Sequence, residues 1–269
     1  MDIINIIIML LIGVFGGFIS GLVGIGGAII IYPAILLLPP LFGAPAYSAY
    51  IASGLTSSQV FFSTLSGSLK ARKKSEFSPQ LVFYMGGGMI IGSMLGALLA
   101  NLFDATFVNM VYIIIALLAL ILMFINVKPS SDQSSFNKPL LVIVGLFVGI
   151  ISGIVGAGGA FIIIPILLVL FKLPMNTVVA NSIVIAFISS IGAFIIKLIQ
   201  GYIPLEDALF LILIGLSLQL IDKMNWWGGV KKTIFVIWNI ASAIFILLGT
   251  LVSLIFIMFT AMLFASGKD

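Results

Sequence analysis

The sequence contains neither cysteine nor histidine, and each absence removes a class of chemistry. Without cysteine there is no disulfide, thiolate nucleophile or ligand set for an Fe–S cluster, and the redox compartment cannot be read. Without histidine there is no imidazole base, haem ligand or histidine-built zinc site. The remaining residues offer no evident nucleophile–base pair or cluster of metal ligands. We therefore expect a protein that is not an enzyme and that carries no cofactor and no metal.

Charge is scarce as well. Only 7% of the 269 residues are charged and 62% are hydrophobic, whereas soluble domains carry about 25% charged residues. With a mean hydropathy of +1.37, the chain cannot cover a water-facing surface. The apolar stretches are much longer than the roughly 10-residue strands of a membrane barrel and do not alternate, so they predict helices. The sequence thus indicates an all-α, multi-pass membrane protein.

What the sequence does contain is a glycine-rich phrase in two copies. The first is GFISGLVGIGGAIIIYP at 17–33 and the second is GIISGIVGAGGAFIIIP at 149–165, with 12 of 17 positions identical. In a membrane protein, matched helix-breaking clusters in two halves of the chain are typical of a transporter binding site.

A polar run, KPSSDQSSFNK, divides the chain near its midpoint. It predicts two homologous repeats, residues 1–127 and residues 139–269, joined by a loop at 128–138. Each repeat contains four apolar segments that we expect to be helical. They cover about 3–38, 46–69, 80–102 and 106–127 in the first repeat, and about 139–171, 175–200, 204–221 and 233–265 in the second.

The first segment of each repeat has an awkward length. About 36 residues of helix would measure roughly 54 Å, against a hydrocarbon core of about 30 Å. Because the glycine cluster lies in the middle, we expect a break into two half-helices, which either cross with a bend or re-enter. Re-entry makes the repeats inverted and places ten of the twelve basic residues on one side, compared with eight if the segments cross. The positive-inside tendency therefore favours re-entrant segments and inverted repeats.

The two glycine clusters predict a binding site for an anion. Glycine lets the chain leave helical dihedrals, and the half-helix that follows starts with amides that have no intrahelical partner. The helix dipole adds positive potential at that end. The alternative is close helix packing, since small residues let backbones approach in lipid. The candidate binding residues are Gly24, Gly26, Gly27 and Ala28 in the first repeat, and Gly156, Gly158, Gly159 and Ala160 in the second.

The second segment of each repeat supplies polar groups without charge. Hydroxyl and amide groups can donate to the oxygens of an anion, and we expect Ser53, Asn181 and Ser182 to do so. Further along the same segments lie Thr56, Ser57, Gln59 and Ser189. The alternative is interhelical hydrogen bonding, worth less than about 1 kcal/mol for each bond.

Other conspicuous residues have structural interpretations. Gly88, Gly92 and Gly96 form a GxxxGxxxG face that predicts helix packing. Lys197 lies near a helix end, where we expect its side chain to snorkel outward. Trp226 and Trp227 are typical of an interfacial belt. All acidic residues fall at predicted ends or loops, so the sequence offers no intramembrane carboxylate relay.

The repeated GxxSGxxGxGGA…P phrase, the second segments that begin after Pro45 and Pro174, and the chain length resemble the TauE/SafE sulfite exporter family. The resemblance covers most of the chain. It implies transport of sulfite, sulfonates and other sulfur-containing or organic anions across the bacterial cytoplasmic membrane, with substrate contacts at the glycines of both phrases. One departure concerns residues 213–219, the counterpart of the small-residue stretch 86–97, because they are not small; this weakens the case for a helix or dimer contact there.

The function predicted is export of such an anion by alternating access. Two alternatives remain: a Na⁺- or H⁺-coupled importer of a small organic acid, and a membrane scaffold without transport. The expected partners are a small anionic substrate and the lipid bilayer, with a homodimer left open. The net charge of +4 comes from lysines that flank membrane segments and does not indicate a nucleic-acid partner.

Overall fold

The fold is described here from a computed structural model, which describes residues 3–23, 27–125, 137–204 and 206–208. All of them belong to one compact unit, Met1–Ile221. Most of the predicted segment at 204–221, the whole segment at 233–265, most of the loop at 128–138, and Gly24, Gly26, Trp226 and Trp227 lie outside the described residues. The division into two inverted repeats stays a prediction.

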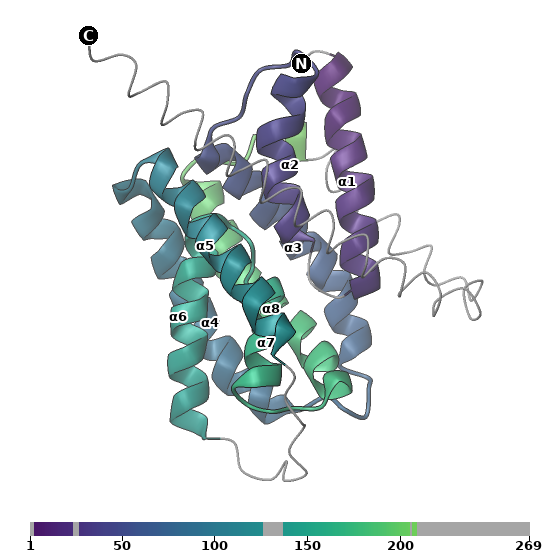
Figure 1. The fold of residues 1–269 in the computed structure, drawn as a ribbon, viewed down its shortest axis with the longest axis vertical. Helices are drawn as coiled ribbons and strands as arrows, with labels where there is room; N and C mark the ends of the chain where they lie inside the picture. The colour runs from purple at the N-terminus through teal and green to yellow at the C-terminus, as the bar shows by residue number, and fades with distance from the viewer. Residues whose placement is uncertain (1–2, 24–26, 126–136, 205, 209–269) are drawn as a thin grey trace, which may run out of the picture. The chain divides into compact units, whose positions relative to one another are not determined.

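Within the described ranges the regular structure is entirely helical (Figure 1). This confirms the predicted helical class. The helices are α1 (Ile3–Val23), α2 (Ala28–Leu41), α3 (Ala49–Ala71), α4 (Pro79–Leu99), the 3₁₀ turn η1 (Ala100–Leu102), α5 (Ala105–Phe124), α6 (Lys138–Val155), α7 (Ala160–Val169) and α8 (Met175–Ile199).

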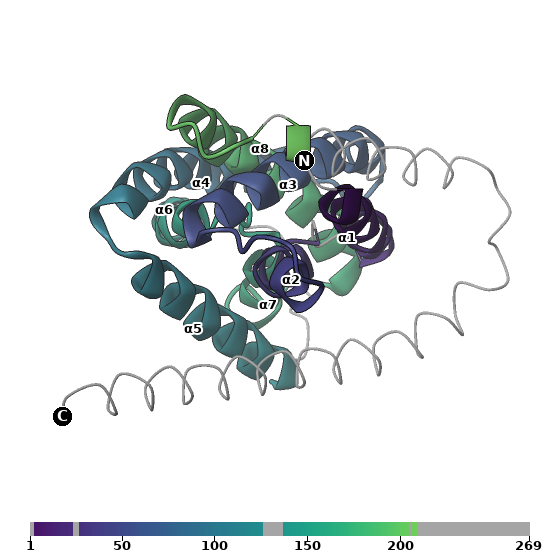
Figure 2. The same cartoon turned by 90° about the horizontal axis from the view of Figure 1, so that it is seen from above.

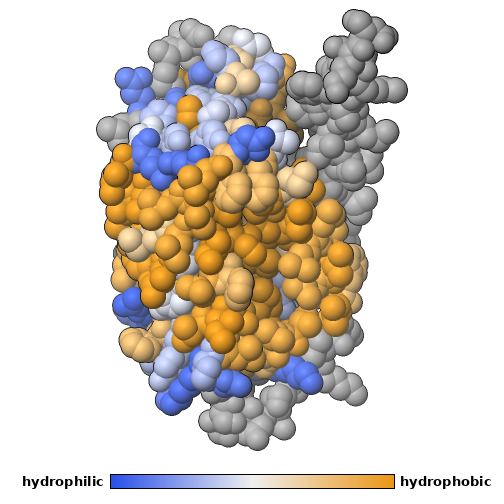
Figure 3. All heavy atoms as spheres, turned by 90° about the vertical axis from the view of Figure 1, so that its left-hand side faces the viewer, coloured by the Kyte–Doolittle hydropathy of each residue, from blue (hydrophilic) through white to orange (hydrophobic). Residues whose placement is uncertain are grey.

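Four stretches in the described chain are long and apolar enough to cross a membrane: Pro79–Leu102, Ala105–Leu122, Lys138–Val155 and Met175–Ile199. Large hydrophobic side chains such as Phe83, Ile121 and Phe147 are exposed on them. Figure 3 shows one face, on which a broad hydrophobic band lies between two more hydrophilic ends. A surface of this kind suits contact with lipid, in agreement with the composition.

Several helices begin where the sequence supplies a capping residue. Side-chain oxygens of Ser48, Ser78, Asp104 and Asn137 accept hydrogen bonds from the amide three residues ahead, at the starts of α3, α4, α5 and α6. Each cap satisfies one amide that has no intrahelical partner. In α4 and α6 a proline follows the cap at the first turn, where its missing N–H costs nothing.

Helices α4 and α6 pack backbone against backbone, side by side in Figures 1 and 2. A Cβ added to Gly88, Gly92 or Gly96 would overlap carbonyl oxygens of Val142, Leu146 and Ile150 on α6, respectively. The contact is reciprocal, because Gly149 on α6 faces the carbonyl oxygen of Met89. The predicted packing role of the GxxxGxxxG face is confirmed.

Helix α3 lies antiparallel to α8 and is enclosed by the bundle. Gly67 of α3 contacts Ile183 near the start of α8, while Ser53 of α3 contacts Lys197 near its end. Between them the ring of Phe61 stacks on Phe194, with centroids 4.8 Å apart. Residues 52–60 of α3 are all buried, so this hydroxyl-rich part of the helix faces protein on every side.

Both overlong apolar segments are interrupted at the glycine clusters. α1 ends at Val23 and α2 begins at Ala28, while α6 ends at Val155 and α7 begins at Ala160. Gly16 of α1 faces the side chain of Ile31, so α2 folds back beside the second half of α1. Whether the interrupted segments re-enter or cross the bilayer stays a prediction.

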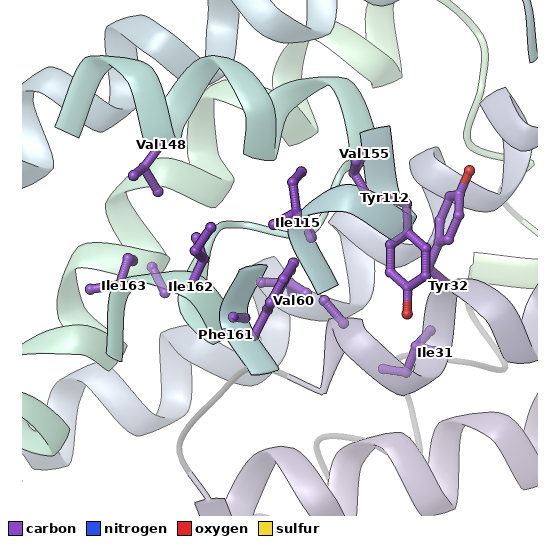
Figure 4. Packing of buried hydrophobic residues seen from close by; sticks show 14 of the residues in the cluster. Ile31, Tyr32, Val60, Tyr112, Ile115, Val148, Val155, Phe161, Ile162 and Ile163 are labelled. Atoms are coloured by element: carbon purple, nitrogen blue, oxygen red, sulfur yellow. The ribbon is translucent and has the colours of Figure 1, made fainter. Parts of the chain in front are cut away.

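Helix α2 is held by two tyrosines. Pro33 has no N–H, so the carbonyl of Ile29 lacks its usual helical donor. The Tyr112 hydroxyl of α5 donates a hydrogen bond to that carbonyl instead. Tyr32 lies against Tyr112 (Figure 4), with ring centroids 4.8 Å apart, and donates to Asn109 Oδ1 at 2.7 Å. The proline of the repeated phrase is thus accommodated by a partner on another helix.

Candidate functional site

The site is built around the four-residue turn 156–159 between α6 and α7. Three of its residues have left-handed dihedrals, with φ of 77° at Gly156, 63° at Gly158 and 70° at Gly159. Gly156 is the C-cap of α6 and Gly159 is the N-cap of α7. Left-handed dihedrals are readily available to glycine and costly for other residues, which explains the glycine-rich phrase locally.

The first copy of the phrase has the same local geometry where it is described. Gly27, the N-cap of α2, has φ 69° and ψ −6°, and Gly159 has φ 70° and ψ −3°. Both carbonyls accept hydrogen bonds from the amides three and four residues ahead, so Ala28 and Ala160 start their helices in the same way. Gly24 and Gly26 lie outside the described residues, and the meeting of the two half-helix starts stays a prediction.

The turn 156–159 is enclosed by three other helices. A Cβ on Gly156 would overlap the carbonyl oxygen of Ser53 on α3. A Cβ on Gly158 would press on Val60 of α3 and lie 3.6 Å from the Cβ of Ser190 on α8. A Cβ on Gly159 would lie 2.6 Å from Met89 Cε on α4. The structure therefore brings Ser53, Gly156, Gly158 and Gly159 together, with Ser53 contributed by the first half of the chain.

The start of α7 offers hydrogen-bond donors inside the protein. Ile162 and Ile163 both donate to the carbonyl of Gly159, so the amides that precede Ile162 have no intrahelical acceptor. Ser152 lies beside Gly159, is 3% exposed, and its hydroxyl has no hydrogen-bond partner. Figure 4 shows Phe161, Ile162 and Ile163 of α7 among the buried apolar cluster. A hydroxyl without a partner, beside amides without an intrahelical acceptor, favours an anion or another acceptor in such apolar surroundings.

Lys197 is the residue that the sequence interpretation missed. We expected its side chain to snorkel outward, and this is wrong, because Lys197 is 0% exposed. Its Nζ donates to Ser53 Oγ at 2.7 Å and to the carbonyl of Ile154 at 3.4 Å. Helical side chains tilt toward the N-terminus of their helix, so a lysine near the end of α8 points back into the bundle. This direction is the feature from which the burial of Lys197 could have been predicted.

A positive charge on Lys197 would be only partly balanced by its surroundings. Ile154 lies in the last turn of α6, where the helix dipole places about half a negative charge, worth at most about 2 kcal/mol to a cation. Holding an ion away from water costs several kcal/mol. Ser53 Oγ is neutral, and no carboxylate among the described residues forms an ion pair with Lys197. An ionised Lys197 is therefore suited to meet a negative charge.

Asn181 and Ser182 lie away from this turn in the structure. The Asn181 side chain accepts from the Ser78 amide at 2.8 Å and donates to the carbonyls of Glu76 and Thr177. It thus ties α8 to the loop before α4, beside a surface cavity of about 380 Å³ lined in part by these residues. The hydroxyl of Ser182 donates to the Val179 carbonyl at 3.4 Å. Their role in binding stays a prediction.

The other polar residues of α3 and α8 divide into two groups. The hydroxyls of Thr56 and Ser57 donate to carbonyls of their own helix, of Ala52 and Gly54, respectively. In contrast, neither amide atom of Gln59 nor the hydroxyl of Ser189 has a partner, although both residues are buried. Gln59 and Ser189 precede Val60 and Ser190, the residues that contact Gly158 in the turn.

Helices that are long and apolar enough to cross a membrane, packed around a helix pair that is interrupted at glycines, are typical of multi-pass membrane transporters. The family model for the sulfite exporter TauE/SafE matches residues 9–221, and the chain belongs to this family. The family is one of membrane transporters, which points away from an enzyme.

Curated relatives agree with this class. The chain is 26% identical over 230 residues to the probable membrane transporter protein YunE of Bacillus subtilis (strain 168), a match that covers 77% of this chain and 84% of that protein. It is also 26% identical to the probable membrane transporter protein YdhB of the same strain, over 74% of this chain and 79% of that protein. A third relative, probable membrane transporter protein MJ0441 of Methanocaldococcus jannaschii, is 26% identical over 73% of this chain and 74% of its own. No solved structure matches the chain.

Proposed function

We propose that this protein is a carrier in the cytoplasmic membrane that exports small sulfur-containing or organic anions, such as sulfite or sulfonates, by alternating access. The observation that carries the proposal is the start of α7 at Gly159, which is enclosed in the bundle beside the unpartnered hydroxyl of Ser152. Donors without partners in an apolar enclosure favour an oxyanion, whose oxygens accept several hydrogen bonds at once. Membership of the TauE/SafE family supports the same class of substrate.

The proposed direction follows from membrane energetics. With an inside-negative potential of about 100 mV, each negative charge that leaves gains about 2.3 kcal/mol, and a dianion about 4.6 kcal/mol. Export therefore needs no coupled cation, whereas uptake of an anion would. Alternating access requires that the enclosed turn become accessible first from one side of the membrane and then from the other.

Ligand binding is the first test. The purified protein is heated with sulfite, sulfate, thiosulfate, sulfoacetate, acetate and chloride in turn. A ligand at a hundred times its dissociation constant stabilises the fold by about 2.7 kcal/mol, a rise in Tm of about 5–11 °C for a protein of this size. The proposal expects a sulfur oxyanion to give this rise and Gly159→Val to abolish it.

Gly43→Val is the matched control. Gly43 has φ 78° with nothing near its Cβ position, so it shares the backbone cost of Gly159→Val without touching the turn. Flux into and out of proteoliposomes follows with the anion that binds. Strict sodium or proton dependence of uptake would replace export with a coupled importer. Absence of any ligand response or flux would favour a scaffold.

A further inference from the structure

A lysine at this enclosed position needs a reason that packing does not supply. The ammonium group bonds two neutral oxygens, Ser53 Oγ and the Ile154 carbonyl, and the side chain is fully buried. A neutral donor such as a glutamine amide could satisfy both oxygens without the cost of removing an ionised group from water. Ionisable side chains inside a membrane bundle are costly and commonly face a substrate or ion pathway.

The position of Lys197 connects it to the turn at 156–159. Ile154, which accepts its hydrogen bond, lies two residues before Gly156, and the backbone of Ser53 packs directly on Gly156. Ser190, which contacts Gly158, lies on the same face of α8 two turns before Lys197, about 10 Å along the axis. α8 therefore holds a hydroxyl residue at the α7 side of the turn and an amine at its α6 side.

We propose that Lys197 is the counter-charge for the transported anion. The ammonium group binds the negatively charged head of a small oxyanion at the α6–α7 turn, where the first amides of α7 and the Ser152 hydroxyl supply further donors. Ser53 and the Ile154 carbonyl hold the ammonium group in place. This rests on the proposed function, because it assigns one charged contact to the anion that the carrier would move. It also gives Ser53 an indirect role, which is to position the amine.

Substitutions at Lys197 separate charge from hydrogen bonding. Lys197→Gln keeps a donor for Ser53 and Ile154 but removes the charge, whereas Lys197→Arg keeps the charge. Lys73→Gln, in the exposed loop after α3, is the control for loss of a positive charge elsewhere. Each full-length variant is purified in lipid nanodiscs, checked for a single folded species, and titrated with sulfite and with sulfoacetate.

We expect Lys197→Gln to weaken binding about 30-fold or more, as loss of one partner of a buried charge pair does. Lys197→Arg is expected to bind more tightly than Lys197→Gln, and Lys73→Gln to match the wild type. Wild-type affinity in the Lys197→Gln variant would overturn the proposal and leave Lys197 as a cap on α6. Failure of the wild type to bind either probe would instead refute the proposed function.

A second measurement detects the contact itself in the wild-type protein, and Lys197→Arg serves only to assign the signal. The protein is labelled with ¹⁵N at lysine side chains and saturated with sulfoacetate carrying ¹³C at its carboxyl group. Solid-state NMR then measures dipolar coupling between the two labels. If the carboxylate is the group bound at Lys197, we expect a coupling that corresponds to an ion-pair distance between the two labels. The signal of the Lys197 amine is identified because it is absent from Lys197→Arg. For a probe bound through the sulfonate, ³³S replaces ¹³C, and absence of both couplings would refute the contact.

Discussion

A single methyl group at Gly156 tests whether the turn depends on its contact with α3. Gly156→Ala places a Cβ on a residue with φ 77°, which costs an alanine about 1–2 kcal/mol. The same Cβ overlaps the carbonyl oxygen of Ser53, a backbone atom that cannot rotate away. Overpacking of this kind costs about 1–3 kcal/mol. The expected total loss of stability is about 2–5 kcal/mol.

Gly43→Ala isolates the contact from the backbone strain. Gly43 has φ 78°, almost the same as Gly156, and nothing lies within 4 Å of its Cβ position. Thermal unfolding in one detergent gives the comparison. Because 1 kcal/mol corresponds to about 2–4 °C in Tm for a protein of this size, Gly156→Ala should melt about 2–12 °C below Gly43→Ala. Equal melting temperatures would show that the turn is not pressed against α3. That result would refute the site geometry described above.

Three further substitutions test the supporting structure. Gly92→Val drives a side chain into the α6 backbone and should cost about 3 kcal/mol or more in unfolding free energy, whereas Gly87→Val has open space and should be nearly neutral; equal costs would refute the α4–α6 contact. Tyr112→Phe removes the donor to the Ile29 carbonyl and should cost about 1–3 kcal/mol. That cost should shrink in a Pro33→Ala background, where residue 33 regains its N–H; a double-mutant cycle without coupling would contradict this account. Asn181→Ala should loosen the 76–78 loop and increase its amide hydrogen exchange, and unchanged exchange would argue against the clamp.

The helix interruptions and the α4–α6 contact were predictable because glycine patterns carry local information. A glycine cluster within an overlong apolar run has few structural interpretations: a break, or a close approach of two backbones. Both occur here, the break at Gly156 to Gly159 and the approach along Gly88, Gly92 and Gly96. The sequence could not show that Ser53 of one half would lie against Gly156 of the other, since that contact depends on how α3 packs.

Lys197 shows where sequence reasoning stops. A lysine two residues from the end of a membrane helix can extend outward to water or fold back along its helix, and both paths suit its four-carbon stem. The direction that the side chain takes depends on whether hydrogen-bond acceptors are present inside the bundle. Here the acceptors are Ser53, which lies on α3 in the first half of the chain, and the carbonyl of Ile154. That carbonyl is available because α6 ends at Val155. The glycine break therefore does two things at once: it starts α7 with free amides and ends α6 with a carbonyl that holds the amine. If the anion binds where these two helix ends meet, the break and the lysine are parts of one site, and neither can be removed without changing the other.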